Sequence, residues 1–186
     1  PSPRLSRGVE LHRRIELHHR AGLAFEEAAE STYDVPAGGG RGRADPFRAF
    51  LTSRFALLRP LLVEAPFELA VGEARVAGRI DAVYEPSPGL WEIVDFKSGR
   101  RQRDPARRVQ LAAYALAVAD AGFAPVPPPR TRVTFAYLGG GRVEEVGEDV
   151  SEAWREEARR RLADLTARAA AGERTPAPSA ACRECD

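Results

Sequence analysis

The chain has 186 residues, 44% of them hydrophobic and 30% charged, which are ordinary values for a soluble globular protein with one core. No apolar run approaches the roughly 20 residues that a membrane-spanning helix needs, and the polar, basic segment 1–20 lacks the pattern of a secretory signal. The formal net charge of +1 says little about partners. Because two cysteines cannot form a disulfide framework, we expect a reducing, cytoplasmic setting.

Two helices are expected in the first third of the chain. Apolar residues between Val9 and Phe25 predict a helix over 5–30. The glycine-rich stretch 37–46 predicts a flexible connection, because glycine does not favour a regular element. A second helix is predicted over 46–60, where apolar side chains recur at helical spacing and Pro60 ends the helix.

The hydrophobic period then changes to two, which is typical of strands. Strands are predicted over 61–71, 73–85 and 90–97, with breaks at Gly72 and at 86–89.

The remaining half of the chain alternates helix and strand. A helix is predicted over 105–121 with Asp104 as its N-cap, followed by a hairpin over 131–147 and a helix from Ser151 to Gly172. This order of elements predicts an α/β fold, in which a central mixed β-sheet is flanked by helices.

Lys97 is the only lysine, so the other 27 of the 28 basic residues are arginines. Alternation along the strand 90–97 places Asp95 and Lys97 on one face. If residues 86–90 form the turn, Asp81 lies opposite Asp95, with Cβ atoms about 5 Å apart. Two carboxylates that close repel each other unless a cation lies between them or one is protonated. A hard divalent ion such as Mg²⁺ is the natural partner, because it prefers oxygen ligands.

Lys97 would lie beside that ion, where it could orient a metal-bound water or stabilise charge on a phosphoryl group. The alternative is a buried ion triad that only holds the hairpin together. A run of arginines follows directly: Arg100, Arg101, Arg103, Arg107 and Arg108. Such a run can be an ordinary solvated loop. Next to an acidic pair, however, it favours a polyanionic substrate, and we expect a nucleic acid.

Five motifs follow one another along the chain: G-V-E-L-H, E-A-P-F, G-R-I-D, I-V-D-F-K-S-G and Q-L-A-A-Y. Together they resemble the RecB-like branch of the PD-(D/E)XK nucleases, and the resemblance covers roughly Gly8 to Leu138. A D-X-K motif by itself would be weak evidence for this family, but five motifs in this order are specific evidence for it. The resemblance implies a restriction-endonuclease-like core and Mg²⁺- or Mn²⁺-dependent hydrolysis of DNA. It also implies a nuclease domain that is attached to a helicase, of the UvrD/RecB type, or that works beside one.

The resemblance also implies individual roles. The metal ligands would be His12, Asp81, Asp95 and the backbone carbonyl of Phe96, while Lys97 would position the attacking water. Gln110 and Tyr114 match the Q-x-x-x-Y signature and would steady the DNA backbone or the lysine. Glu64 and Glu16 are further candidates near the metal.

Cys182 and Cys185 form half of a metal site in the loop-like tail 173–186. Several RecB-like nucleases hold an iron–sulfur cluster with one cysteine before the histidine motif and three near the C-terminus. This sequence alone cannot complete such a cluster. We therefore expect residues 1–186 to be a single nuclease domain from a longer helicase–nuclease, in which the cluster is possible.

Two other functions stay open on the sequence. One is a catalytically inactive module of the same fold that binds DNA or acts as a scaffold. The other is a stand-alone nuclease of the CRISPR-adaptation type, which shares these motifs.

Overall fold

A computed structural model describes residues 3–25, 45–101, 105–120, 123 and 128–172. In chain order its elements are α1 (Pro3–Phe25), α2 (Pro46–Leu51), the 3₁₀ helix η1 (Arg54–Ala56), β1 (Pro60–Val71), β2 (Ala74–Ser87), β3 (Leu90–Lys97), α3 (Pro105–Asp120), β4 (Arg130–Tyr137), β5 (Glu144–Asp149) and α4 (Glu152–Ala170).

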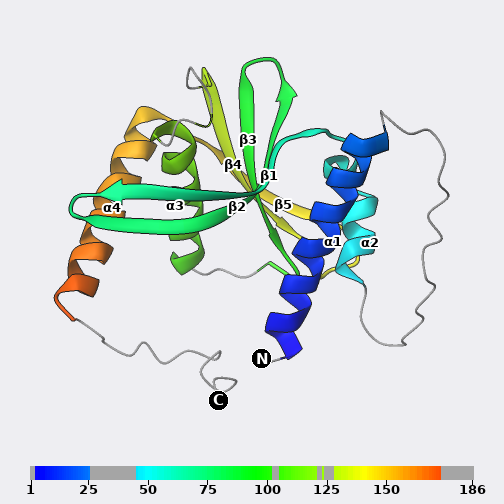
Figure 1. Ribbon diagram of the computed structural model, residues 1–186, viewed down its shortest axis with the longest axis horizontal. Coiled ribbons are helices and arrows are strands. Elements are labelled where there is room, and N and C mark those ends of the chain that lie inside the picture. Colours follow the sequence, from blue (N-terminus) through cyan, green and yellow to red (C-terminus); the bar gives the residue numbers. More distant parts are fainter. Residues whose placement is uncertain (1–2, 26–44, 102–104, 121–122, 124–127, 173–186) are drawn as a thin grey trace.

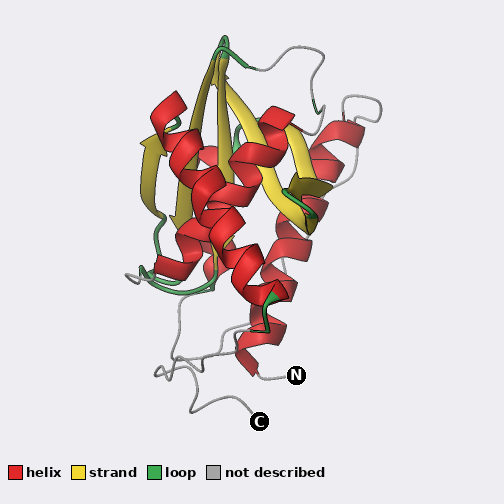
Figure 2. Ribbon diagram, turned by 90° about the vertical axis from the view of Figure 1, so that its left-hand side faces the viewer, coloured by secondary structure: helices red, strands yellow, loops and turns green. Residues whose placement is uncertain are grey.

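The strands form one five-stranded sheet in the order β1-β2-β3-β4-β5. Strands β3 and β4 are parallel, whereas the other neighbouring pairs are antiparallel. Helices α1 and α2 lie on one side of the sheet, and α3 and α4 lie on the other (Figures 1 and 2). The predicted mixed sheet with flanking helices is therefore confirmed.

Each face of the sheet carries its own apolar cluster. One cluster packs Ile93 of β3 against α3 and α4, and the other packs Val94 and Phe96 of the same strand against α1, α2 and η1. Because β3 is covered on both faces, residues 92–96 are all buried. The end of β3, with Asp95, Phe96 and Lys97, is thereby held rigidly between two helical layers.

The antiparallel register of β2 and β3 matches the prediction. Tyr84 pairs with Glu92 and Ala82 with Val94, so the same register places Asp81 opposite Asp95. The turn starts two residues later than predicted, because β2 continues through Pro86 to Ser87 across an irregularity in its pairing with β3. Gly89, with φ +73°, makes the tight turn possible.

The prediction of one helix over 46–60 was wrong. Helix α2 ends at Leu51, because the hydroxyl of Thr52 donates to the carbonyls of Arg48 and Ala49 and that of Ser53 donates to Phe50. A separate 3₁₀ turn follows, and β1 begins at Pro60 itself.

Where the structure describes them, the ends of α4 agree with the prediction, and α1 begins two residues earlier than predicted. Helix α1 runs from Pro3, and residues 26–30 of its predicted span lie outside the described residues. Helix α4 begins after Ser151, whose side chain accepts from Trp154 N–H, and ends before Gly172 at φ +74°. Asp104 and most of the stretch 37–46 are outside the described residues. Among the described helices, we find none with the length and apolarity to cross a bilayer.

Candidate active site

Three side chains from three elements converge beside the end of β3. His12 of α1, Glu64 of β1 and Asp81 of β2 each offer a ligand atom, and these atoms all lie within 4.8 Å of one another. The Nδ1 atom of His12 lies 3.3 Å from Oε1 of Glu64 and 3.5 Å from Oδ1 of Asp81. One imidazole nitrogen therefore faces two carboxylates.

Glu64 reaches this position through an uncommon backbone conformation. Its φ is +47°, and it is the only non-glycine residue with positive φ among those that the structure describes. The left-handed region costs an L-residue roughly 1–2 kcal/mol. The Glu64 carbonyl accepts a hydrogen bond from Nη1 of Arg79 at 3.1 Å, and Nε of the same arginine lies 3.8 Å from Glu64 Oε2. Strained residues of this kind gather at functional sites.

Asp81 lies where β2 and β3 stop pairing. Beyond the pair of Ala82 and Val94, the backbone N–H of Phe96 donates to the Asp81 carboxylate at 2.8 Å. Asp81 and Asp95 are 6% and 0% exposed. Burial, and then the charge of Asp95, raises the pKa of Asp81, although His12 and the Phe96 N–H act in the opposite direction. A buried carboxylate pair of this kind favours a cation.

His12 bridges the two halves of the site. Its Nε2–H donates to the carbonyl of Phe96 at 3.0 Å, while Nδ1 faces the carboxylates. Burial alone would lower the pKa of His12, but the hydrogen bond to Glu64 and the charges of Asp81, Glu64 and Asp95 outweigh it and raise that pKa to about 9. In the absence of another cation, a proton on His12 balances the carboxylates.

Lys97 lies on the α3 side of the same constellation. Its ammonium donates to Oδ1 of Asp95 at 3.0 Å and to Oε1 of Gln110 at 2.9 Å, and it forms an ion pair with Oδ2 of Asp95 at 2.7 Å. The Gln110 amide in turn donates to the hydroxyl of Tyr114 at 2.7 Å. The Q-x-x-x-Y spacing thus places both side chains on one face of α3, one turn apart.

Tyr114 is itself held by an aromatic contact that depends on a glycine. The rings of Phe67 and Tyr114 meet edge to face, with centroids 5.7 Å apart. Phe67 lies across from Gly78 in the β1–β2 pair, where a Cβ atom would come within 2.8 Å of the phenyl ring. The glycine of the G-R-I-D motif therefore makes the space for the ring that supports Tyr114.

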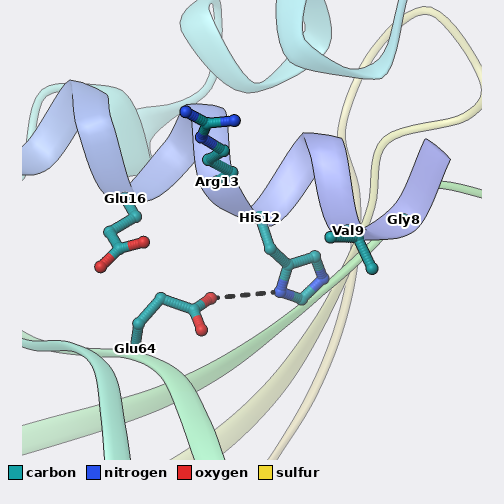
Figure 3. A pocket seen from close by; sticks show the side chains of 6 residues that line it. All are labelled: Gly8, Val9, His12, Arg13, Glu16 and Glu64. Carbon is teal, nitrogen blue, oxygen red and sulfur yellow. Dashed lines mark hydrogen bonds and ion pairs between the residues drawn. The ribbon is translucent and has the colours of Figure 1, made fainter. Parts of the chain in front are cut away.

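A cavity of about 500 Å³ opens beside His12 (Figure 3). It is lined by Gly8, Val9, His12, Arg13 and Glu16 of α1 and by Glu64 of β1. In Figure 3, His12, Glu16 and Val9 extend from the side of α1 that faces Glu64. Glu16 forms an ion pair with Arg20 at 2.7 Å, so it lines the approach to the site without joining the three-residue group.

The donor set fits a hard divalent ion. Carboxylate and carbonyl oxygens with a single imidazole nitrogen suit Mg²⁺ or Mn²⁺ better than a thiolate-seeking metal. The buried pair Asp81 and Asp95 supplies more negative charge than Lys97 alone offsets. His12, Glu64, Asp81 and the Phe96 carbonyl are therefore the groups that could hold such an ion.

The structure distributes the predicted site residues in two groups. His12, Glu64, Asp81 and the Phe96 carbonyl gather on one side, whereas Asp95, Lys97, Gln110 and Tyr114 form a linked chain on the other. Arg100 and Arg108 are exposed, and Arg101 pairs with Glu144 at 3.3 Å. The Arg107 side chain, Arg103, Cys182 and Cys185 lie outside the described residues.

Sequence reasoning did not find Arg79 or Phe67. Both belong to motifs that the sequence analysis identified: Arg79 is part of G-R-I-D, and Phe67 is part of E-A-P-F. Arg79 could have been identified from its spacing, because it lies two residues before the candidate ligand Asp81 and therefore on the same face of the strand.

Comparisons with known proteins place the chain in a family. The crystal structure of a "putative exonuclease" from Eubacterium rectale is similar, with a TM-score of 0.50 and 14% sequence identity. The match covers 97% of this chain and 74% of the exonuclease chain. The match to the crystal structure of SSO0001 has a TM-score of only 0.38 and 19% sequence identity. It covers 61% of this chain and 50% of the SSO0001 chain. No curated protein matches. Residues 3–186 match the family described as the PD-(D/E)XK nuclease superfamily, and the chain belongs to that family.

Proposed function

We propose that this chain is a Mg²⁺- or Mn²⁺-dependent deoxyribonuclease that hydrolyses DNA phosphodiester bonds. The observation that carries the proposal is the position of Lys97. Its ammonium joins Asp95 to Gln110 directly beside the three candidate ligands His12, Glu64 and Asp81. A structural ion triad would need neither a second group of converging ligands nor an adjoining cavity.

Hydrolysis adds water across a P–O bond and yields a phosphate monoester and an alcohol. A divalent ion, when bound, supplies Lewis-acid polarisation of the phosphoryl group and a water of lowered pKa. Asp81, Glu64 and His12 would hold that ion, and the Phe96 carbonyl would add a neutral oxygen ligand. Lys97 places its positive charge where negative charge develops on the phosphoryl oxygens, and Gln110 fixes its ammonium there.

The cavity beside His12 gives the DNA strand a place next to the reacting phosphate. It borders the candidate ligands His12 and Glu64, and its wall includes the exposed apolar side chain of Val9. A nucleoside adjoining the scissile phosphate fits such a wall through its apolar faces. The exposed Arg100 and Arg108 could then contact phosphates further along the strand.

The biological setting rests on the likeness to relatives. The RecB-like motifs support a nuclease domain that works with a helicase in DNA repair or recombination, and the name of the similar Eubacterium rectale protein supports exonuclease action. The stand-alone nuclease of the CRISPR-adaptation type uses the same motifs. A helicase domain in the same polypeptide or in a partner would support the helicase-linked setting over the stand-alone one.

The decisive experiment is cleavage of end-labelled linear single- and double-stranded DNA with Mg²⁺ or Mn²⁺. The parent chain is compared with Lys97→Ala and with Lys97→Arg, which retains the charge but changes its shape. We expect metal-dependent degradation by the parent and loss of cleavage in Lys97→Ala. An RNA of the same sequence serves as the control for the sugar.

Binding of DNA without cleavage under either metal would favour the inactive module. Cleavage that survives in Lys97→Ala would remove the proposed role of the lysine. Degradation of RNA but not of DNA would contradict the proposal that DNA is the substrate.

A further inference from the structure

Arg79 contacts Glu64 at two points. Its Nη1–H donates to the Glu64 backbone carbonyl at 3.1 Å, and its Nε lies 3.8 Å from the Glu64 carboxylate. The arginine side chain remains 56% exposed, whereas that of Glu64 is 14% exposed. Arg79 therefore covers Glu64 from the solvent side.

The backbone contact falls on a residue whose conformation needs support. Glu64 has φ +47°, and it interrupts the regular pairing of β1 with β2 between the pairs of Val63 with Ala82 and Ala65 with Ile80. A backbone carbonyl that leaves a strand ladder needs another donor, and the guanidinium of Arg79 provides one. Without that donor, Glu64 can relax towards an ordinary extended conformation, which turns its side chain to a different direction.

The direction of the Glu64 side chain matters to His12. Oε1 of Glu64 lies 3.3 Å from Nδ1 of His12, and the opposite ring nitrogen of His12 donates to the Phe96 carbonyl. The contacts therefore run without a break from Arg79 through Glu64 and His12 to the end of β3. Three of the groups along this route are candidate metal ligands.

We propose that Arg79 is a positioning residue, which holds Glu64 in its left-handed conformation so that Glu64 and His12 are set to receive the divalent ion. This inference rests on the proposed metal-dependent function. It assigns Arg79 an action through Glu64, and not a direct contact with the DNA.

The test is a double-mutant cycle on the intact chain. Mn²⁺ affinity is measured by calorimetry, and the kcat and KM for a single-stranded oligonucleotide are measured separately, for the parent, Arg79→Ala, Glu64→Ala and the double variant. Arg75→Ala is the matched control, because Arg75 lies on the same strand and pairs with the exposed Glu68. Arg79→Lys, which keeps a donor and the charge, is the conservative variant.

We expect Arg79→Ala to weaken Mn²⁺ binding about tenfold, as loss of a residue that orients a ligand commonly does. The kcat should fall while KM for DNA stays unchanged, and Arg79→Lys should restore part of the affinity. In the Glu64→Ala background, Arg79→Ala should have no further effect, because the residue through which it acts is gone. Arg75→Ala should match the parent.

Unchanged Mn²⁺ affinity with a raised KM would overturn the proposal and make Arg79 a DNA-contacting residue. Additive effects in the double variant would also overturn it, because Arg79 would then act independently of Glu64. A parent that binds Mn²⁺ but cleaves no DNA would overturn the proposed function alone, and the Mn²⁺ cycle would still decide the role of Arg79. A parent that binds no Mn²⁺ would overturn both.

Discussion

The ammonium of Lys97 is fixed between Asp95 and Gln110, with the oxygen of Gln110 2.9 Å away. Removal of Gln110 leaves the ammonium with its ion pair to Asp95 and a contact 5.9 Å from the centre of the Phe135 ring, so its position is less closely defined. We expect Gln110→Ala to lower kcat about tenfold, as is common for residues that orient an active-site group, with Mn²⁺ affinity nearly unchanged. Single-turnover cleavage and calorimetry measure the two quantities.

Tyr114→Phe is the matched control for Gln110→Ala. It removes the hydroxyl that receives the Gln110 amide but leaves the oxygen of Gln110 on Lys97. Its effect on kcat should be clearly smaller. If Tyr114→Phe is as damaging as Gln110→Ala, Tyr114 acts on the substrate directly.

Gly8 offers a way to narrow the cavity without disturbing the fold. A Cβ atom there would meet nothing within 4 Å, and leucine is a better helix former than glycine by roughly 0.5–1 kcal/mol. We expect Gly8→Leu to raise KM for DNA about tenfold, a typical penalty for filling part of a binding pocket, while Mn²⁺ affinity is unchanged. Gly8→Ala should have a smaller effect. Parent-like kinetics in Gly8→Leu would mean that the DNA strand passes elsewhere.

Two glycines near Lys97 should respond differently to substitution by alanine. A Cβ at Gly139 would lie 2.6 Å from the backbone of Ser98 and Gly99, while a Cβ at Gly99 would meet nothing within 4 Å. The backbone N–H of Gly139 also donates to the Gly99 carbonyl at 3.0 Å. We expect Gly139→Ala to lower the free energy of unfolding by about 1–3 kcal/mol and to reduce cleavage, because Ser98 follows Lys97 directly.

Urea unfolding and cleavage rates measure both glycine variants. Gly99→Ala should match the parent in stability and activity. Equal stability of the two variants would show that the loop after β3 yields to the added methyl group.

The buried His19 should make the protein sensitive to acid. The residue is 4% exposed, and its Nε2 lies 2.8 Å from the Tyr84 hydroxyl. Burial, with a smaller effect of the neighbouring His18, lowers the pKa of His19 to about 4. The unfolded chain, with an ordinary histidine pKa of about 6.5, then binds more protons between these values. The free energy of unfolding contributed by His19 is complete above pH 6.5 and falls by roughly 3 kcal/mol as the pH drops to about 4.

Urea unfolding at a series of pH values, for the parent and His19→Gln, isolates this contribution. His12 and Asp81 titrate in both proteins, so the difference between the two curves belongs to His19. Tyr84→Phe should keep the acid sensitivity, because the His19 ring stays buried. Parallel curves for the parent and His19→Gln would contradict the prediction.

The sequence predicts the sheet well, because alternation and turns are local signals. The β2–β3 register, with Asp81 opposite Asp95, follows from the turn position alone, although the turn itself is shorter than predicted. The helix over 46–60 was wrong because the hydroxyls of Thr52 and Ser53 compete with the helix for its carbonyls. The spacing of apolar residues carries no information about that competition.

Other features depend on partners that are distant in sequence. Glu92 is 1% exposed in the strand that carries Asp95, and it accepts from Arg54 at 2.7 Å and from Thr134 at 2.7 Å. A glutamate in an apolar strand gives no local sign of these partners, which lie 38 and 42 residues away. The left-handed Glu64 is likewise invisible, since no glycine marks the position. The motifs identify candidate residues, and only the fold shows how they are divided between the metal side and the lysine side.

His12 and the Phe96 carbonyl, which are 84 residues apart, meet only when α1 lies on the sheet. The apolar contact of that helix comes from a few buried side chains, among them Leu11 and Ile15. An opening motion that lifts α1 would dismantle the candidate metal group while β2, β3 and α3 stay folded. Hydrogen exchange in α1 should therefore slow when Mn²⁺ is added, because an ion held by His12, Glu64 and Asp81 together would stabilise the docked state by mass action. A bound metal ion would thus stabilise the packing of α1 on the sheet as well as take part in hydrolysis.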